Sequence, residues 1–533
     1  MPQVEAPVRA GSELVPLPVG FSVHRIFSSI LSNWFGLGAN VLVAFLITPF
    51  VIRHLGNTSY GIWALILQCT GYMGVIDVGV RSALVRFVAR FHAEGKLEDV
   101  NEFLSTALLV YGGLSLLLIV WGAVLAAFVI PHMNIPAPML ASARAVLLLS
   151  VCTGAVAVPL GAFQAVLAAL FRWPLLNGVA IGTLLARTAL IVLVLWKGHG
   201  LVALALIHCI STAVGAFIHL FLSRRCLPGL VFSTKLARRK MVGPLFRHGL
   251  YSALISAGNR LNYEVDNIVI AAFLPVGLIA FYVIGSRLVQ YWRDLVNGAV
   301  QIVMPLVSGL EARGSAEDLG LLFLRTTKYL LLLGSPLALG LLLLGPDFIR
   351  LWMGPDYAAR SGLVLVILGA AQFVSLTECS ASAVLCGLSK HKANVWCTGL
   401  EGILNLGLSV ALVRPYGIYG VALGTTLAVV VVRGFVYPPI YFRLLQVSAA
   451  SFFRKAVWPS VAPTLVFGIG VWCCKRWIPV THYIGMLAAA MPPLMCCLLW
   501  TWFFCLENTE RQRLRHLALH HLGRCPRSVE LHG

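Results

Sequence analysis

"LISAGNRLNYEVDNIVIAAFLP" runs from Leu254 to Pro275 and has the length and much of the composition of a membrane-spanning helix. It also carries three charged residues, Arg260, Glu264 and Asp266. A charge at the centre of a bilayer costs at least about 2.5 to 3.5 kcal/mol, even on the mildest scale. The stretch therefore predicts a membrane helix whose polar side faces other helices or water and not lipid.

The rest of the chain has the composition of a polytopic membrane protein. It is 59% hydrophobic and 11% charged, with a mean hydropathy of +0.87, which excludes an ordinary soluble domain. Apolar runs of about 20 residues recur from end to end, as bilayer-crossing helices require. We therefore expect an all-α fold with about fourteen transmembrane helices, at 30–52, 60–80, 103–130, 141–169, 174–196, 201–222, 249–273, 277–306, 326–345, 361–387, 394–413, 417–440, 457–474 and 483–505.

A faint internal repeat predicts that these spans form two similar halves. "AVLAAL" at Ala165 returns as "AVLCGL" at Ala383, and "VAL" at Val202 returns at Val421. We expect two pseudo-repeated six-helix lobes followed by two C-terminal helices. The expected parts are a cytoplasmic segment at 1–28, an N-lobe at 29–222, a basic cytoplasmic linker at 223–248, a C-lobe at 249–445, two extra spans at 446–505 and a basic cytoplasmic tail at 506–533.

The distribution of basic residues explains the net charge of +20. Most of the 40 Lys and Arg residues fall in alternate loops, and the other loops hold only Arg53, Lys197, Arg350, Arg360, Arg414, Lys475 and Arg476. This asymmetry predicts that both termini are cytoplasmic, and it favours anionic lipid over nucleic acid as the partner of the basic surface. No cysteine pair has metal-ligand spacing, and His516, His520, His521 and Cys525 fit a soluble basic tail better than a metal site. We expect no cofactor.

The charged spans contain the candidate functional residues. At 100° per residue, the polar residues of the seventh span fall within an arc of about 160°: Asn259, Arg260, Tyr263, Glu264, Asp266 and Asn267. Arg260 and Glu264 are four apart and can pair along the helix. Arg187 and Arg287 lie in other spans, and their roles could be functional or structural. Asp77 and Arg81 are also four apart, near the cytoplasmic end of the second span, where a structural helix-end pair or a gating pair would fit.

Several stretches resemble the bacterial polysaccharide biosynthesis proteins, the lipid-linked oligosaccharide flippases. They are "LGNTSYGIWALILQCTGYMGVIDVGVRSALVRFVARF", "NYEVDNIVIAAFLPVGLIAFYVIG", "FIRLWMGPDYA" and "YGIYGVALGTTLA". This family shares a superfamily with multidrug and toxin extrusion transporters and the peptidoglycan lipid flippase. The resemblance covers roughly residues 31–446, and its motifs are loose.

The resemblance implies a V-shaped pair of six-helix lobes in the inner membrane. Such a protein moves undecaprenyl-pyrophosphate-linked sugars from the cytoplasmic to the periplasmic leaflet, is not an enzyme, and works with other polysaccharide assembly proteins. It also implies that cavity arginines hold the pyrophosphate, here Arg260 with Arg187 and Arg287. The first span lacks the charged pair of the peptidoglycan lipid flippase, which favours an O-antigen, capsule or exopolysaccharide unit. Coupling to Na⁺ or H⁺ through Glu264 or Asp266 stays open.

Two alternative functions follow from the same sequence. A cation-coupled drug exporter of the same superfamily would be expected to carry an acidic residue deep in the first lobe, where only Asp77 occurs, near a helix end. A membrane polysaccharide polymerase or glycosyltransferase would need a sizeable outer loop with catalytic residues, and the outer loops are short. A lipid-linked oligosaccharide flippase is therefore the favoured prediction.

Overall fold

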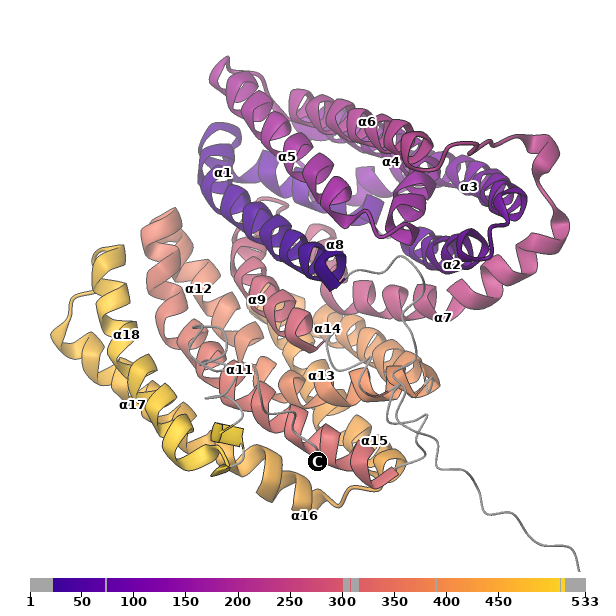
Figure 1. Cartoon of the computed structure of the whole chain (residues 1–533). Coiled ribbons are helices and arrows are strands. Elements are labelled where there is room, and N and C mark those ends of the chain that lie inside the picture. The colour runs from indigo at the N-terminus through magenta and orange to yellow at the C-terminus, as the bar shows by residue number, and fades with distance from the viewer. Residues whose placement is uncertain are drawn as a thin grey trace, which may run out of the picture. The chain divides into compact units, whose positions relative to one another are not determined.

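A computed structural model describes residues 23–71, 74–300, 307, 316–388, 391–508 and 510–512, and these residues form helices joined by short turns (Figure 1). The N-terminal segment before residue 23 and the tail cluster of His516, His520, His521 and Cys525 lie outside this range. The predicted all-α fold is confirmed. The helices are α1 (Val23–Gly71), α2 (Gly74–Ala93), α3 (Leu97–Val124), α4 (Leu140–Ala169), α5 (Trp173–Trp196), α6 (Leu201–Cys226), α7 (Arg239–Tyr263), α8 (Val265–Phe273), α9 (Leu278–Val300), α11 (Ala316–Met353), α12 (Pro355–Ala370), α13 (Gln372–Gly387), α14 (His391–Val431), α15 (Tyr437–Leu445), α16 (Ala449–Phe452), α17 (Trp458–Trp477) and α18 (Tyr483–Trp500).

Within the described ranges, nine helices are long and apolar enough to cross a membrane, or ten if the bent pair α12 and α13 forms one span. The difference from fourteen has physical causes. Helices α1 and α14 each join two predicted spans across a glycine with positive φ, Gly56 and Gly417. Two further predicted spans fall on α7 to α9, where α7 is polar, α8 has only nine residues, and α9 carries Arg287, Arg293 and Asp294. The number fourteen stays a prediction.

The described residues divide into two compact units. The first comprises the described parts of Met1–Leu55, Thr70–Pro131 and Leu140–Ala253, and the second comprises those of Gly56–Cys69, His132–Met139 and Leu254–Gly533. The expected lobe boundaries stay a prediction. The second unit thus includes two segments from the first half of the sequence, and hydrogen bonds tie both to it. Tyr357 donates to Asn57 Oδ1 at 2.5 Å, and Asn134 Nδ2 donates to Ala272 O at 2.9 Å.

The first unit packs α2, α3, α4 and α6 around a core that includes Leu84, Phe103, Tyr111 and Phe163. The connection between α6 and α7 is fixed to the first turns of α3. Asn101 Nδ2 donates to Gly229 O at 3.1 Å, and Thr106 Oγ1 accepts from Arg238 N at 2.9 Å. These side chains supply partners that the linker backbone lacks outside regular helix. The linker is therefore part of the first unit.

The second unit packs α9 and α11 to α14 together, with the α17–α18 hairpin against α11 (Figure 1). Lys475 of α17 donates to Leu343 O at 2.9 Å and forms an ion pair with Asp347, while Arg350 donates to Val480 O at 2.6 Å. The two C-terminal helices are thus fastened to α11 by charged and carbonyl groups as well as by apolar contact.

The faint repeat of the sequence recurs in backbone conformation. Gly198 and Gly417, which precede the two "VAL" motifs, both have positive φ, at +81° and +59°. The motifs at Ala165 and Ala383 both form the last turn of a helix, α4 and α13. Equivalent sequence positions therefore have equivalent local structure in the two halves.

Candidate functional site

The opening stretch forms an interrupted helix and not the single helix predicted for 249–273. Helix α7 ends at Tyr263, Glu264 has φ −118° and ψ −14°, and α8 begins at Val265. The uniform 100° spacing behind the predicted polar arc therefore fails at Glu264. Arg260 and Glu264 remain partly open, whereas Asp266 and Asn267 are buried. The break at Glu264 separates the Arg260–Glu264 pair from Asp266 and Asn267, which uniform helical spacing would place on one face.

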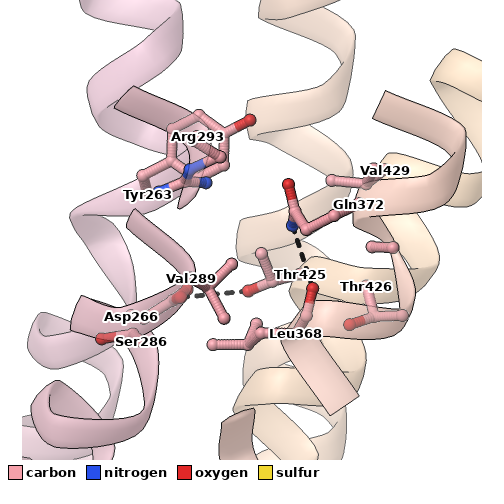
Figure 2. Close-up of a pocket in the computed structure, with 11 residues that line it drawn as sticks. Tyr263, Asp266, Ser286, Val289, Arg293, Leu368, Gln372, Thr425, Thr426 and Val429 are labelled. Atoms are coloured by element: carbon pink, nitrogen blue, oxygen red, sulfur yellow. Dashed lines mark hydrogen bonds between the residues drawn. The ribbon is translucent and has the colours of Figure 1, made fainter. Parts of the chain in front are cut away.

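Asp266 lies at the centre of a buried hydrogen-bond cluster and is only 3% exposed. Figure 2 shows the hydrogen bond between Thr425 and its carboxylate. Thr425 Oγ1 lies 3.0 Å from Oδ2, and Asn405 Nδ2 donates to Oδ1 at 3.2 Å. The Tyr282 hydroxyl also donates to this carboxylate. The three partners come from α9 and α14, and such bonds offset part of the cost of burying the charge.

The two hydroxyl groups of the cluster on α14 each lie close to several oxygens. Thr425 Oγ1 has one proton, yet it lies 3.0 Å from Asp266 Oδ2, 3.0 Å from Asn405 Oδ1 and 3.2 Å from Val421 O. Ser409 Oγ lies 3.0 Å from the same Asn405 oxygen and 3.3 Å from Val421 O. A buried carboxylate among hydroxyl, amide and carbonyl oxygens offers the ligand type that a hard cation prefers, and it can also take up a proton.

A small cavity adjoins these oxygens, and the space open to the centre of a water molecule is about 30 Å³. A single water needs about 10 to 15 Å³ by this measure. Asp266, Thr425 and Gln372 line the cavity, and Gln372 Oε1 is buried with no hydrogen-bond partner in the described parts of the chain (Figure 2). The cavity can therefore hold a water or a small ion next to the carboxylate.

A second charge network lies in the same unit around Arg433. Its guanidinium forms two hydrogen bonds with Glu401, at 2.7 and 2.9 Å, and one of 3.1 Å with Glu378. It also donates to the Tyr263 hydroxyl at 2.7 Å, and Arg293 stacks on the Tyr263 ring with 3.5 Å to the centroid. Glu401 lies on α14 and its side chain is only 3% exposed, and Arg433 lies in the π-helical turn η5 (Val432–Val436). This buried bidentate pair therefore links α14 to η5.

The two arginines of the second unit that the sequence singled out differ in their surroundings. Arg260 Nη1 lies 2.7 Å from Glu264 Oε2, so the predicted pair forms. Arg287 on α9 is exposed and has no hydrogen bond or ion pair with any residue that the structure describes. Tyr60 and Tyr291 lie close enough to interact electrostatically with its guanidinium. Arg287 is therefore free to bind an anion, while Arg260 already has one.

Arg187 belongs to the first unit, on α5, and its Nη1 lies 3.3 Å from His208 Nδ1 on α6. An arginine is always protonated, so His208 must accept at Nδ1 and be neutral. The structure thus brings Arg260 and Arg287 into one unit and Arg187 into the other.

Asp77 and Arg81 also pair, at 2.8 Å, within the first unit. Tyr111 donates to Asp77 Oδ1 at 2.8 Å, and Arg81 Nη1 donates to Gln164 Oε1 at 3.1 Å. Gln164 Nε2 lies 3.2 Å from His219 Nδ1. The pair is embedded in a network that joins four helices, which fits a structural role at least as well as a gate.

Sequence reasoning missed the three partners of Asp266, which are Tyr282, Asn405 and Thr425, and Ser409, which contacts Asn405. Polar side chains within apolar spans were the available signal, because such residues usually face a bundle interior or a cavity. Asn405 and Ser409 are also four apart on α14 and share a helix face. Among the described residues, no group of three or more His, Cys, Asp or Glu side chains could hold a metal ion.

Comparisons with known proteins agree with this architecture. The chain is similar to the uncharacterized membrane protein EpsK of Bacillus subtilis (strain 168), with 22% identity over 489 residues, or 89% of this chain and 94% of that protein. It is also similar to the probable flippase AglR of Haloferax volcanii, with 23% identity over 405 residues, or 73% of this chain and 79% of that protein.

Solved structures show the same fold. The lipid II flippase MurJ, in an inward closed conformation, has a TM-score of 0.71 at 14% identity, with 90% of this chain and 98% of that chain covered. An inward-facing transporter of the multidrug resistance MATE family has a TM-score of 0.64 at 13% identity, with 82% and 98% covered. At these identities the likeness concerns the fold.

The family assignment rests on a sequence model and on the helices described above. The model described as "Polysaccharide biosynthesis protein" matches residues 26–311, just over half of the 533 residues. The apolar helices and the membrane-protein relatives together identify a multi-pass membrane protein. The chain therefore belongs to the polysaccharide biosynthesis protein family.

Proposed function

We propose that this protein is a flippase for undecaprenyl-pyrophosphate-linked oligosaccharide repeat units of an O-antigen, capsule or exopolysaccharide. It moves them from the cytoplasmic to the periplasmic leaflet of the bacterial inner membrane by alternating access. Its termini are cytoplasmic, it works as a transporter and not as an enzyme, and other polysaccharide assembly proteins are candidate partners. The family and the flippase names among its relatives support this proposal.

The observation that carries the proposal is the lack of a described partner for Arg287. It is an arginine within a predicted span that has neither a carboxylate nor a hydrogen-bond partner among the described residues. An unpaired intramembrane charge is expensive, so it must face water or an anionic ligand. A guanidinium donates paired hydrogen bonds to phosphate oxygens and stays charged at any relevant pH. We therefore rank Arg287 above Arg260 and Arg187 as the group that holds the pyrophosphate.

The physical task also fits a transporter of this kind. A sugar headgroup cannot cross hydrocarbon, whereas its lipid tail can remain there, so the protein needs to supply only a wet path that opens to each side in turn. Outward movement of an anion follows the membrane potential and is favoured by about 2.3 kcal/mol per charge per 100 mV. The potential can therefore contribute to export.

A coupling cation would bind at Asp266 and not at Glu264. Glu264 is already paired with Arg260 at 2.7 Å, whereas Asp266 has no ion pair among the described residues and lies among hydroxyl and amide oxygens. The adjoining cavity of about 30 Å³ has room for a small ion. Either Na⁺ or H⁺ can bind to oxygens of this type. Asn259 and Asn267 remain candidate residues of the cation pathway.

The test is translocation of the lipid-linked glycan in proteoliposomes. We expect Arg287→Ala to lower the rate at least tenfold, with Arg260→Ala less affected. Arg443→Ala, an exposed arginine at the end of α15 with no described contact, is the matched control. Equal rates for Arg287→Ala and Arg443→Ala would contradict the assignment of Arg287.

A deletion strain tests the function itself. Lipid-linked repeat units should accumulate on the cytoplasmic leaflet, and their structure would identify the substrate. Normal arrival of those units in the periplasm, in a strain with no other flippase, would show that the proposed function is wrong.

A cation-coupled multidrug and toxin extrusion antiporter is the second candidate. The fold of the MATE-family transporter favours it. The buried acid Asp266 would be its cation site, in the second unit and not in the first lobe, where such an exporter would be expected to carry it. It differs in its substrates, which are drugs rather than lipid-linked glycans. Increased drug susceptibility of the deletion strain, with normal polysaccharide export, would select this alternative.

A further inference from the structure

The second unit contains a larger cavity than the one beside Asp266, with a volume of about 520 Å³. Residues of α7, α9, α13 and α14 line it, together with Arg433 of the π-helical turn η5. Pockets for drug-sized molecules commonly measure about 300 to 1000 Å³. The space is therefore large enough for a sizeable organic ligand.

The wall of the cavity includes four amide side chains, namely Asn259, Gln290, Asn297 and Asn394. Asn259 on α7 is exposed and has no hydrogen bond with the residues that the structure describes. Asn297 on α9 is also exposed, and its contact with the Cys379 thiol is long, at 3.9 Å. Each amide offers two donors and two acceptor lone pairs. Two helices thus present unused hydrogen-bonding groups to the same cavity.

The charged groups of the wall compensate one another. Arg433 lies between Glu401 and Glu378, with contacts of 2.7 to 3.1 Å. Arg293 stacks on Tyr263 and donates to Gln290. Two arginines and two carboxylates, Arg293, Arg433, Glu378 and Glu401, therefore sum to no net charge. The wall therefore suits a neutral ligand with many hydroxyl groups better than an anion.

We propose that this cavity binds the glycan of the lipid-linked substrate, with Asn259 and Asn297 hydrogen-bonding its hydroxyl groups. The inference rests on the proposed flippase function and adds the place where the sugar is recognised. A sugar hydroxyl both donates and accepts, as an amide does. A site that hydrogen-bonds hydroxyl groups discriminates strongly against a ligand that lacks them, because its polar groups are then left unpaired. Asn259 and Asn297 are therefore specificity-determining residues.

Binding to the full-length protein in detergent micelles tests this assignment. The probes are undecaprenyl pyrophosphate and the undecaprenyl-pyrophosphate-linked glycan that accumulates in the deletion strain. We expect the wild type to prefer the glycan-bearing lipid at least tenfold. Asn259→Leu and Asn297→Leu should each reduce that preference about tenfold, or about 1.4 kcal/mol, without changing the affinity for undecaprenyl pyrophosphate.

Asn508→Leu is the matched control, because Asn508 is an exposed asparagine beyond the last span and outside the cavity. It should retain the full preference. An unchanged preference in both cavity variants would overturn the proposal, and so would an equal loss of affinity for the two lipids. The proposed function would instead be refuted if the wild-type protein bound neither lipid and the deletion strain accumulated no glycan-bearing lipid.

Discussion

The substitution Asp266→Asn tests which of two carboxylates, Asp266 or Glu264, couples transport to a cation. The change keeps the shape of the side chain and removes its charge, at a position that is 3% exposed and contacts Tyr282, Asn405 and Thr425. An amide can still bond to these partners, so we expect folding to survive. The affinity for a cation should fall sharply, because the change removes the only carboxylate that contacts those oxygens within the described part of the chain.

The magnitude follows from linkage between binding and stability. If 150 mM Na⁺ is about 100-fold above the dissociation constant, it stabilises the folded state by about 2.7 kcal/mol. The second unit spans about 300 residues, and for that size this corresponds to a rise in melting temperature of about 4 °C. We expect this rise in the wild type and in Glu264→Gln, and none in Asp266→Asn.

The assay is thermal unfolding in detergent, with choline replacing Na⁺. Asp356→Asn is the matched control, since Asp356 is an exposed acid in the first turn of α12. A Na⁺-dependent rise that persists in Asp266→Asn but disappears in Glu264→Gln would refute the assignment. A wild type that responds to pH and not to Na⁺ would identify the bound cation as a proton.

Three further predictions concern stability. Arg433→Met leaves two buried carboxylates without their cation and should lower the free energy of unfolding by about 3 to 5 kcal/mol, as denaturant titration would show. Gly61→Ala would place a Cβ atom 2.2 Å from Val276 O and should cost about 1 to 3 kcal/mol, whereas Gly112→Ala meets nothing within 4 Å and should be tolerated. Hydrogen bonds from the neighbouring lysine and arginine lower the pKa of Glu94 from 4.5 to about 2. Their stabilisation is present above the ordinary pKa and lost as the pH falls through about 2, so Glu94→Gln should shift the melting temperature equally at pH 7 and pH 5.

The sequence predicts the fold well because its main signal is local. Runs of apolar residues long enough to cross a bilayer identify helices wherever they occur. The spans that were harder to count are those with polar faces, since their average hydropathy falls. The opening stretch is an example: its charges are evident, but the end of α7 at Tyr263 depends on packing that no local pattern records.

The candidate site was only half predictable for a related reason. Helical periodicity places Arg260 next to Glu264, and that pair forms at 2.7 Å. The partners of Asp266 are 16, 139 and 159 residues away in sequence: Tyr282, Asn405 and Thr425. Contacts at such separations arise when helices pack, and one sequence does not specify which polar face meets which.

The charges of α8 and α9 suggest how the two proposed ligands would act on each other. Asp266 and Arg287 have no salt bridge within the described chain, and they would bind opposite charges. Ser286 lines the cavity beside Asp266, and Arg287 is the next residue on α9. A cation in that cavity would therefore alter the helix that carries the anion-binding arginine. If it does, the effect must be reciprocal, because coupling between two binding equilibria is symmetric.

Na⁺ should raise the affinity for undecaprenyl pyrophosphate by the same factor by which that lipid raises the affinity for Na⁺, about 5- to 150-fold. Binding titrations in both directions would measure the two factors, and Arg287→Ala should reduce both to one. Unequal factors in the wild type would show that the titrations report different processes, and equal factors of one would mean that Asp266 and Arg287 bind their ligands independently.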